Sequence, residues 1–167
     1  VQKNRLAIFD EIQNDATVRA ALRQKLNAIV SMEWEICPAS RDVDDVKIST
    51  FVKDALDNFS GTVNSLIVNI LDAVAKGFCM VEMIYGVAQG GPWQGYTVLD
   101  HFAPHNPEDF QFTLTRYGGV DRIINYTTTG VEQDIDKESV IHYAYDGRYR
   151  MPWGTSDLKS CYKHWRS

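Results

Sequence analysis

The stretch VNSLIVNILDAVAKGFCMVEMIYGV, residues 63–87, decides the fold because the spacing of its apolar residues changes midway. Its first half carries apolar side chains at helical intervals. They are Val63, Leu66, Ile67, Ile70, Leu71 and Val74. Gly77 then stands where a helix commonly ends in a left-handed residue, and from Phe78 the apolar period falls to about two, as in a strand. We therefore predict a helix that leads directly into a strand.

Further helices are predicted on the N-terminal side of this stretch. Within residues 1–30 apolar residues recur about one helical turn apart, and Asp15 is suited to be the N-cap of a second helix. Residues 48–59 show the same spacing, and Ser60-Gly61 separates this helix from the next one. We therefore predict that the first half of the chain is mainly helical.

One strand is predicted among these helices. Met32, Trp34 and Ile36 alternate with two glutamates, the pattern of a half-buried strand, and Pro38 closes it.

The C-terminal half reads as antiparallel strands. Residues 78–87 and 93–102 flank a Gly-Gly-Pro turn and predict a hairpin. Further strands are predicted over residues 110–116, 123–128 and 140–145, and a last helix starts after Thr155 or Ser156. Helices first and strands later indicate an α+β fold, with N-terminal helices packed on a mainly antiparallel β-sheet and a helix beginning at the C-terminus.

Length and charge limit the function classes. The 167 residues fit one domain of ordinary size. Up to Asp146 the chain has 12 Lys/Arg against 21 Asp/Glu, a net charge of −9, whereas from Gly147 it has 5 against 1, a net charge of +4. The bulk of the domain should therefore repel a phosphate backbone, and only the tail could attract one.

Cysteine usage and hydropathy bear on the compartment. Cys37, Cys79 and Cys161 are odd in number and far apart, which argues against a disulfide framework or a zinc site and favours a reducing cytoplasm. No apolar run approaches the roughly 20 residues that a membrane span needs. Because the chain begins with Val1 and ends at Ser167 inside a predicted helix, we expect it to be a piece of a longer protein.

Catalytic chemistry finds little support. Asp100, His101 and His105 could hold a metal, but Asp100 and His101 point to opposite faces of a strand, so an ordinary strand-end turn is favoured. Glu82 interrupts an apolar run and could be a catalytic acid. The favoured interpretation is a structural carboxylate paired with an arginine. The arginines considered are Arg116, Arg122 and Arg150. We expect no enzyme, no cofactor and no metal.

Residues 146–167 interleave bases with aromatic side chains. The candidate subunit or partner interface is Tyr149, Arg150, Trp153 and Trp165. The possible DNA-facing or interface basic stripe is Lys159, Lys163 and Arg166. Arginine and tryptophan are frequent interface anchors, and bases with aromatics can also contact nucleic acid. A protein interface, direct DNA contact and a solvated helix face all stay open.

The order of several elements resembles the Mu-like family of portal proteins from tailed bacteriophages. The features that carry the resemblance run along almost the whole chain. They are Arg23 before WEICP at 34–38, DAVAKGF at 72–78, VEMIY at 81–85, the hairpin tryptophan at 93, VIHY at 140–143, and MPWG at 151–154 before Asp157-Leu158. Mu-like portals often have tyrosine in place of Trp153. We expect the regions that would form the stem, clip and crown to lie outside these 167 residues.

The resemblance implies a structural role. Residues 1–155 would be a wing-like α+β domain, and residues 156–167 the start of a truncated helix leading toward the stem. Portal subunits form a dodecameric ring at one capsid vertex, through which double-stranded DNA is packaged and ejected. Partners would be other portal subunits, terminase, and capsid and head-completion proteins. The location would be the virion, after assembly in the bacterial host cytoplasm, with no membrane.

Without the stem, we expect the isolated chain to be a monomer or a weak oligomer.

Two alternative functions stay open. One alternative function is a cytosolic protein-binding module that docks a partner through the aromatic and basic surface around Trp153 and Trp165. The other is a hydrolase using Glu82, Asp100, His101 and His105.

Overall fold

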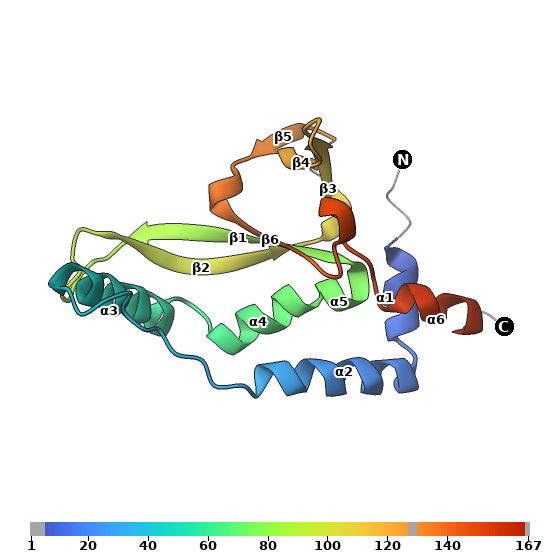
Figure 1. Ribbon diagram of the computed structural model, residues 1–167, viewed down its shortest axis with the longest axis horizontal. Coiled ribbons are helices and arrows are strands. Elements are labelled where there is room, and N and C mark those ends of the chain that lie inside the picture. The colour runs from blue at the N-terminus through green and yellow to red at the C-terminus, as the bar shows by residue number, and fades with distance from the viewer. Residues whose placement is uncertain (1–5, 127–129, 166–167) are drawn as a thin grey trace.

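The computed structural model describes residues 6–126 and 130–165, except for the side chain of Lys163. Figure 1 shows three layers: a small sheet, a second sheet below it, and helices beneath both. In the described residues, helices α1 to α5 precede every strand and α6 follows the last one, so the predicted α+β class is confirmed. Among the described residues, no helix combines the length and the apolar character needed to cross a bilayer.

The helices lie close to their predicted positions. They are α1 (Ala7–Gln13), α2 (Ala16–Val30), α3 (Val43–Asn58), α4 (Val63–Leu71), α5 (Ala73–Lys76) and α6 (Leu158–Trp165). Asp15 caps α2 as predicted, because its carboxylate accepts hydrogen bonds from the N–H groups of Thr17 and Val18 at 2.9 and 3.0 Å. The helical spacing of the apolar residues thus predicted where the helices lie, and the capping side chain of Asp15 predicted where α2 begins.

The predicted change from helix to strand is confirmed. α5 ends at Lys76, and Gly77 has a φ of +96°, a conformation that glycine adopts without steric cost. The strand β1 (Phe78–Val87) follows immediately. Its first four residues are all buried, which explains why the apolar run there is nearly continuous.

The strands form two antiparallel sheets rather than one. The first has the order β2-β1-β6, with β2 (Thr97–His105) and β6 (Val140–Ala144) on either side of β1. The second has the order β3-β4-β5. Its strands are β3 (Phe110–Leu114), β4 (Val120–Tyr126) and β5 (Glu132–Ile135). β5 was not predicted because its sequence, EQDI, is almost entirely polar.

The two faces of β1 serve two cores. Phe78 and Met80 pack with residues of the second sheet, among them Phe112, whereas Cys79 and Val81 pack with Leu66 of α4 and its neighbours. Because successive strand residues point to opposite faces, β1 separates a core between the two sheets from a core between the first sheet and the helices.

The predicted strand at residues 32–36 is wrong. Residues 33–38 are neither helix nor strand, and Trp34 is 44% exposed. The segment links α2 to α3 along the lower edge of the molecule (Figure 1), and none of its backbone groups pairs with a described strand. An alternating pattern needs a neighbouring strand to become part of a sheet, and this chain places none beside it.

The second strand of the hairpin starts later than predicted. Residues 93–96 belong to the turn, and β2 begins at Thr97. The Trp93 indole N–H donates to Asp54 at 2.8 Å, and its ring meets that of Phe51 at 4.9 Å in an edge-on contact. The tryptophan is therefore held by α3 instead of by the sheet.

Candidate functional site

The chain returns from β6 to α6 through a loop that crosses the junction of α5 and β1. The Tyr145 N–H donates to the Gly77 carbonyl at 2.8 Å, and the Thr155 N–H donates to the Tyr145 carbonyl at 2.6 Å. Gly154, with a φ of +53°, lies so close to the Gly77 and Tyr145 backbones that a Cβ would overlap both. The sequence MPWG therefore ends in glycine because two backbones meet there.

The start of α6 is fixed to α5. The buried Ser156 hydroxyl donates to the Ala75 carbonyl and accepts from the Leu158 N–H at 3.1 Å. The Asp157 N–H donates to the Val74 carbonyl at 3.0 Å. Ser156, and not Thr155, thus supplies the side-chain cap, and Leu158 is buried against Ile12. The direction in which α6 leaves the domain is set by these contacts.

A second connection joins α2 to the same loop. The Lys25 ammonium donates to the Asp157 carboxylate and, at 2.7 Å, to the Tyr145 hydroxyl. The hydrogen bond to Asp157, reinforced by the one to Tyr145, raises the pKa of Lys25 above its usual range. Both charged side chains are partly exposed, so this trio orients α6 more than it stabilises the domain.

The predicted aromatic interface residues lie on the loop and at the end of α6. Tyr149 is 92% exposed, and both Tyr149 and Arg150 have positive φ angles, 56° and 59°, which strains residues that carry a Cβ. Trp153 meets the Phe112 ring at 6.0 Å in an edge-on contact. Trp165, the last residue of α6, is 39% exposed. The two indole rings make no ring contact with each other among the described residues.

The predicted basic stripe is only partly described. Lys159 is exposed on α6. Lys163 lies in the same helix, and its side chain is outside the described part of the structure. Arg166 also lies outside the described residues.

The candidate catalytic residues occur as two separate pairs. Glu82 contacts His105, with 2.9 Å between Oε2 and Nε2, so the expected arginine partner is wrong. Asp100 contacts its neighbour His101, with 2.7 Å between Oδ2 and Nδ1. Over the described ranges, no three His, Cys, Asp or Glu side chains gather in a way that could hold a metal ion.

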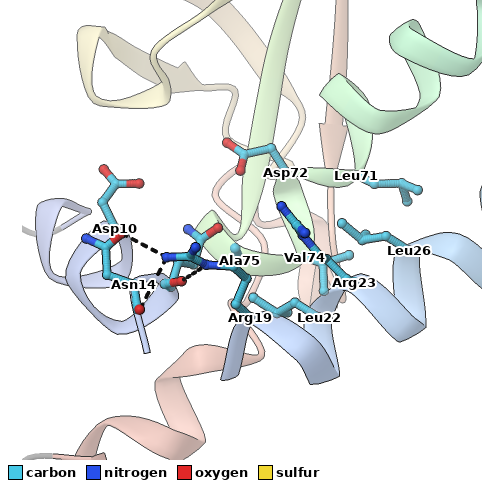
Figure 2. Close-up of a pocket in the computed structure, with 11 residues that line it drawn as sticks. Asp10, Asn14, Arg19, Leu22, Arg23, Leu26, Leu71, Asp72, Val74 and Ala75 are labelled. Atoms are coloured by element: carbon cyan, nitrogen blue, oxygen red, sulfur yellow. Dashed lines mark hydrogen bonds between the residues drawn. The ribbon is translucent and has the colours of Figure 1, made fainter. Parts of the chain in front are cut away.

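A pocket of about 560 Å³ lies between α2 and the α4–α5 side of the molecule (Figure 2). Its apolar wall is made of Leu22, Leu26, Leu71, Val74 and Ala75. Figure 2 shows Arg19 and Arg23 on successive turns of α2, with Arg23 rising toward the opposite side. We did not predict this pocket. The available signal was the i,i+4 spacing of the two arginines, which places them on one helix face.

The fold and the site together define an α+β domain whose C-terminal loop is fixed to the helices and whose surface carries exposed aromatic and basic side chains. The family model described as the portal protein of Mu bacteriophage matches residues 6–166. Because this match covers nearly the whole chain, the protein belongs to that family. Its role is therefore that of a structural component of a phage portal, which is located in the virion capsid and assembles with other portal subunits.

Proposed function

We propose that this chain helps to form the conduit at the capsid vertex through which double-stranded DNA is packaged and ejected, and that the same ring bears the head–tail connector. The observation that carries the proposal is the match to the portal family over residues 6–166. The net charge of −9 up to Asp146 supports it, because an acidic wall lets DNA slide without binding its phosphates. The role is structural, without catalysis.

The domain division follows from the same proposal. Residues 1–155 would be the wing-like domain, and residues 156–167 would begin the helix that leads toward the stem. The hydrogen bonds of Ser156 and Asp157 to the Ala75 and Val74 carbonyls support this division, since a helix that transmits a fixed direction needs a fixed start.

The C-terminal surface would make the contacts of the assembled portal. Tyr149, Arg150, Trp153 and Trp165 would contact a neighbouring subunit or a partner such as terminase, a capsid protein or a head-completion protein. The exposure of Tyr149 and Trp165 supports this assignment. The stripe of Lys159, Lys163 and Arg166 would face the DNA or the next subunit. Assembly would take place in the host cytoplasm.

The function is tested in a phage whose gene for this protein is interrupted by a stop codon. We expect heads that lack DNA, because the entry route is missing, and DNA content is measured by nuclease protection. Heads filled with DNA would contradict the proposal. Supplying the protein from a plasmid should restore DNA-filled heads.

The basic stripe is tested by the triple variant K159A/K163A/R166A. We expect altered packaging at an unchanged melting temperature, because the sequence predicts a solvated basic helix face and substitutions on such a face rarely change stability by more than about 0.5 kcal/mol. Loss of ring assembly at the same melting temperature would assign these residues to the subunit interface instead. The variant K47A/K53A, in which two exposed lysines of α3 are replaced, is the matched control.

A further inference from the structure

The pocket between α2 and the α4–α5 side carries two arginines, Arg19 and Arg23, that form no ion pair with a described residue. Asp10 and Asp72 at its rim both contact the Lys76 ammonium, at 3.4 and 3.3 Å. Arg19 donates only to neutral acceptors, the Gln13 and Asn14 carbonyls and the Asn14 side-chain oxygen. Arg23 makes no ion pair or hydrogen bond with any described residue. Arg19, Arg23 and Lys76 outnumber Asp10 and Asp72 by one positive charge. The two arginines also repel each other at their i,i+4 spacing, so a carboxylate beside them is favoured.

The apolar wall of the pocket adds a second requirement. Leucine, valine and alanine side chains line one side, and a volume of about 560 Å³ is in the range of pockets that enclose a compact group. A guanidinium also binds the face of an aromatic ring, tryptophan best of all. The ligand that fits both requirements is an aromatic side chain flanked by carboxylates.

The segment Glu33–Ile36 has this chemistry. Its aromatic ring and its carboxylates form no ring contact and no ion pair with the described residues of the same chain. Trp34 is 44% exposed and contacts no described aromatic ring. Glu33 and Glu35 on either side are exposed and form no ion pair with a described residue. The alternating sequence is typical of a half-buried segment, and the fold covers Ile36 partly while it leaves 44% of Trp34 exposed. The exposed part of Trp34 and the two glutamates are therefore available to a second molecule.

The segment is directed away from the pocket of its own chain. Arg19 lies near the start of α2 and Arg23 at its middle, whereas Glu33–Ile36 follows the C-terminal end of α2 and runs on toward α3 at the far side of the molecule (Figure 1). α3 is held there by the contact of Phe51 with Trp93. The donor segment and the acceptor pocket are therefore separated along the long axis, which suits a contact between two copies.

We propose that the segment Glu33–Ile36 of one copy docks in the pocket of a second copy. Trp34 would lie against the leucines and the Arg23 guanidinium, and Glu33 and Glu35 would pair with the long arginine side chains at the rim. Because segment and pocket are different surfaces, the contact is heterologous, the type that produces rings when the rotation closes. The inference rests on the proposed function in that its partner is another portal subunit.

The test uses sedimentation velocity on the 167-residue chain and two variants, W34A and R23E, separately and mixed. We expect weak, concentration-dependent association of the unmodified chain and an association at least about tenfold weaker for each variant alone, as for an interface anchor. Mixed in equal amounts, the variants should form dimers and nothing larger. In such a dimer the intact Trp34 of the R23E chain enters the intact pocket of the W34A chain.

Controls separate docking from folding. R41E reverses the charge of another exposed arginine, and Y117A removes another exposed aromatic ring. Both control variants should associate like the unmodified chain. W34F keeps a ring and should restore much of the association. Circular dichroism of every variant should match that of the unmodified chain, because the side chains that are replaced, Trp34 and Arg23 and those of the controls, are all exposed.

The outcomes that overturn the docking are distinct from those that overturn the portal role. No association of the unmodified chain, variants that associate as it does, or a mixture that associates no better than its components would each overturn the docking. If the intact protein nevertheless forms rings, the proposed function stands. If the mixture dimerises but the intact protein forms no ring, the docking stands and the proposed conduit fails.

Discussion

Gly154 lies against the backbone carbonyl of Gly77, so closely that there is no room for a Cβ on Gly154. This contact joins the loop before α6 to the point where the helical layer passes into β1. It fixes the C-terminal helix relative to the rest of the domain, together with the hydrogen bonds of Tyr145, Ser156 and Asp157. In a portal subunit, the geometry of the exit from the domain would depend on this contact.

Replacing Gly154 with alanine should destabilise the domain strongly. The residue has a φ of +53°, and a Cβ would overlap the backbone of Gly77 and Tyr145. We expect a loss of about 3 kcal/mol in the free energy of unfolding, since a left-handed residue with a side chain alone costs about 1–3 kcal/mol. Urea unfolding measures it. Gly90→Ala, where a Cβ meets nothing, is the control, and equal stability of both variants would contradict the close contact.

Acidification should weaken the fold through His142. Burial lowers the pKa of this imidazole below its ordinary value of 6.5, although its hydrogen bond to the Pro152 carbonyl acts in the opposite direction. Below pH 6.5 the unfolded chain therefore binds a proton that the folded chain does not, and stability falls until the folded pKa is also passed.

The pH effect is measured as melting temperature between pH 7.5 and pH 5. His142→Gln retains a donor for Pro152 and cannot titrate, so its melting temperature should decline less on acidification than that of the unmodified chain. A parallel decline in both proteins would show that His142 does not contribute.

The three cysteines should differ sharply in reactivity. Cys37 and Cys161 are exposed, whereas Cys79 is buried and its burial raises its pKa to about 11. Because the thiolate is the reactive form, a thiol reagent at pH 8 should modify Cys37 and Cys161 quickly and Cys79 only after denaturant is added. Mass spectrometry identifies the modified residues. Rapid modification of Cys79 in the native chain would contradict its place in the core.

The ion pair between Lys25 and Asp157 should contribute little to stability. Their side chains are 48% and 38% exposed, and pairs of this kind are worth up to about 1 kcal/mol. A double-mutant cycle with Lys25→Met and Asp157→Asn should yield a coupling free energy within this limit that decreases with added salt. A coupling above about 2 kcal/mol would show that the trio is a main support of α6.

Much of the fold follows from local patterns in the sequence. The change of apolar period at Gly77 predicted the junction of α5 and β1, and Asp15 marked the start of α2. Local patterns failed where a partner decides the outcome. The alternation around Trp34 has no neighbouring strand, and the polar residues of β5 form a strand because β4 lies beside them. The division into two sheets depends on contacts between distant residues, which periodicity does not contain.

The site was less predictable than the fold. The portal family was identified from the order of short motifs, and the match over residues 6–166 confirms it. The role of Tyr149 in an interface stays a prediction. The trio of Lys25, Tyr145 and Asp157 unites residues more than a hundred positions apart, and no spacing in the sequence predicts such a contact. Glu82 pairs with His105 because the register of β1 and β2 brings them near, and that register was not part of the prediction.

The central claim is that this chain is a subunit of a portal ring, and cryo-electron microscopy of the intact protein tests it most directly. We predict a closed ring with a central channel wide enough for duplex DNA, with α6 continuing toward the stem and the Trp34 segment of each subunit in its neighbour's pocket. A monomer, or a closed assembly with no channel, would contradict the claim.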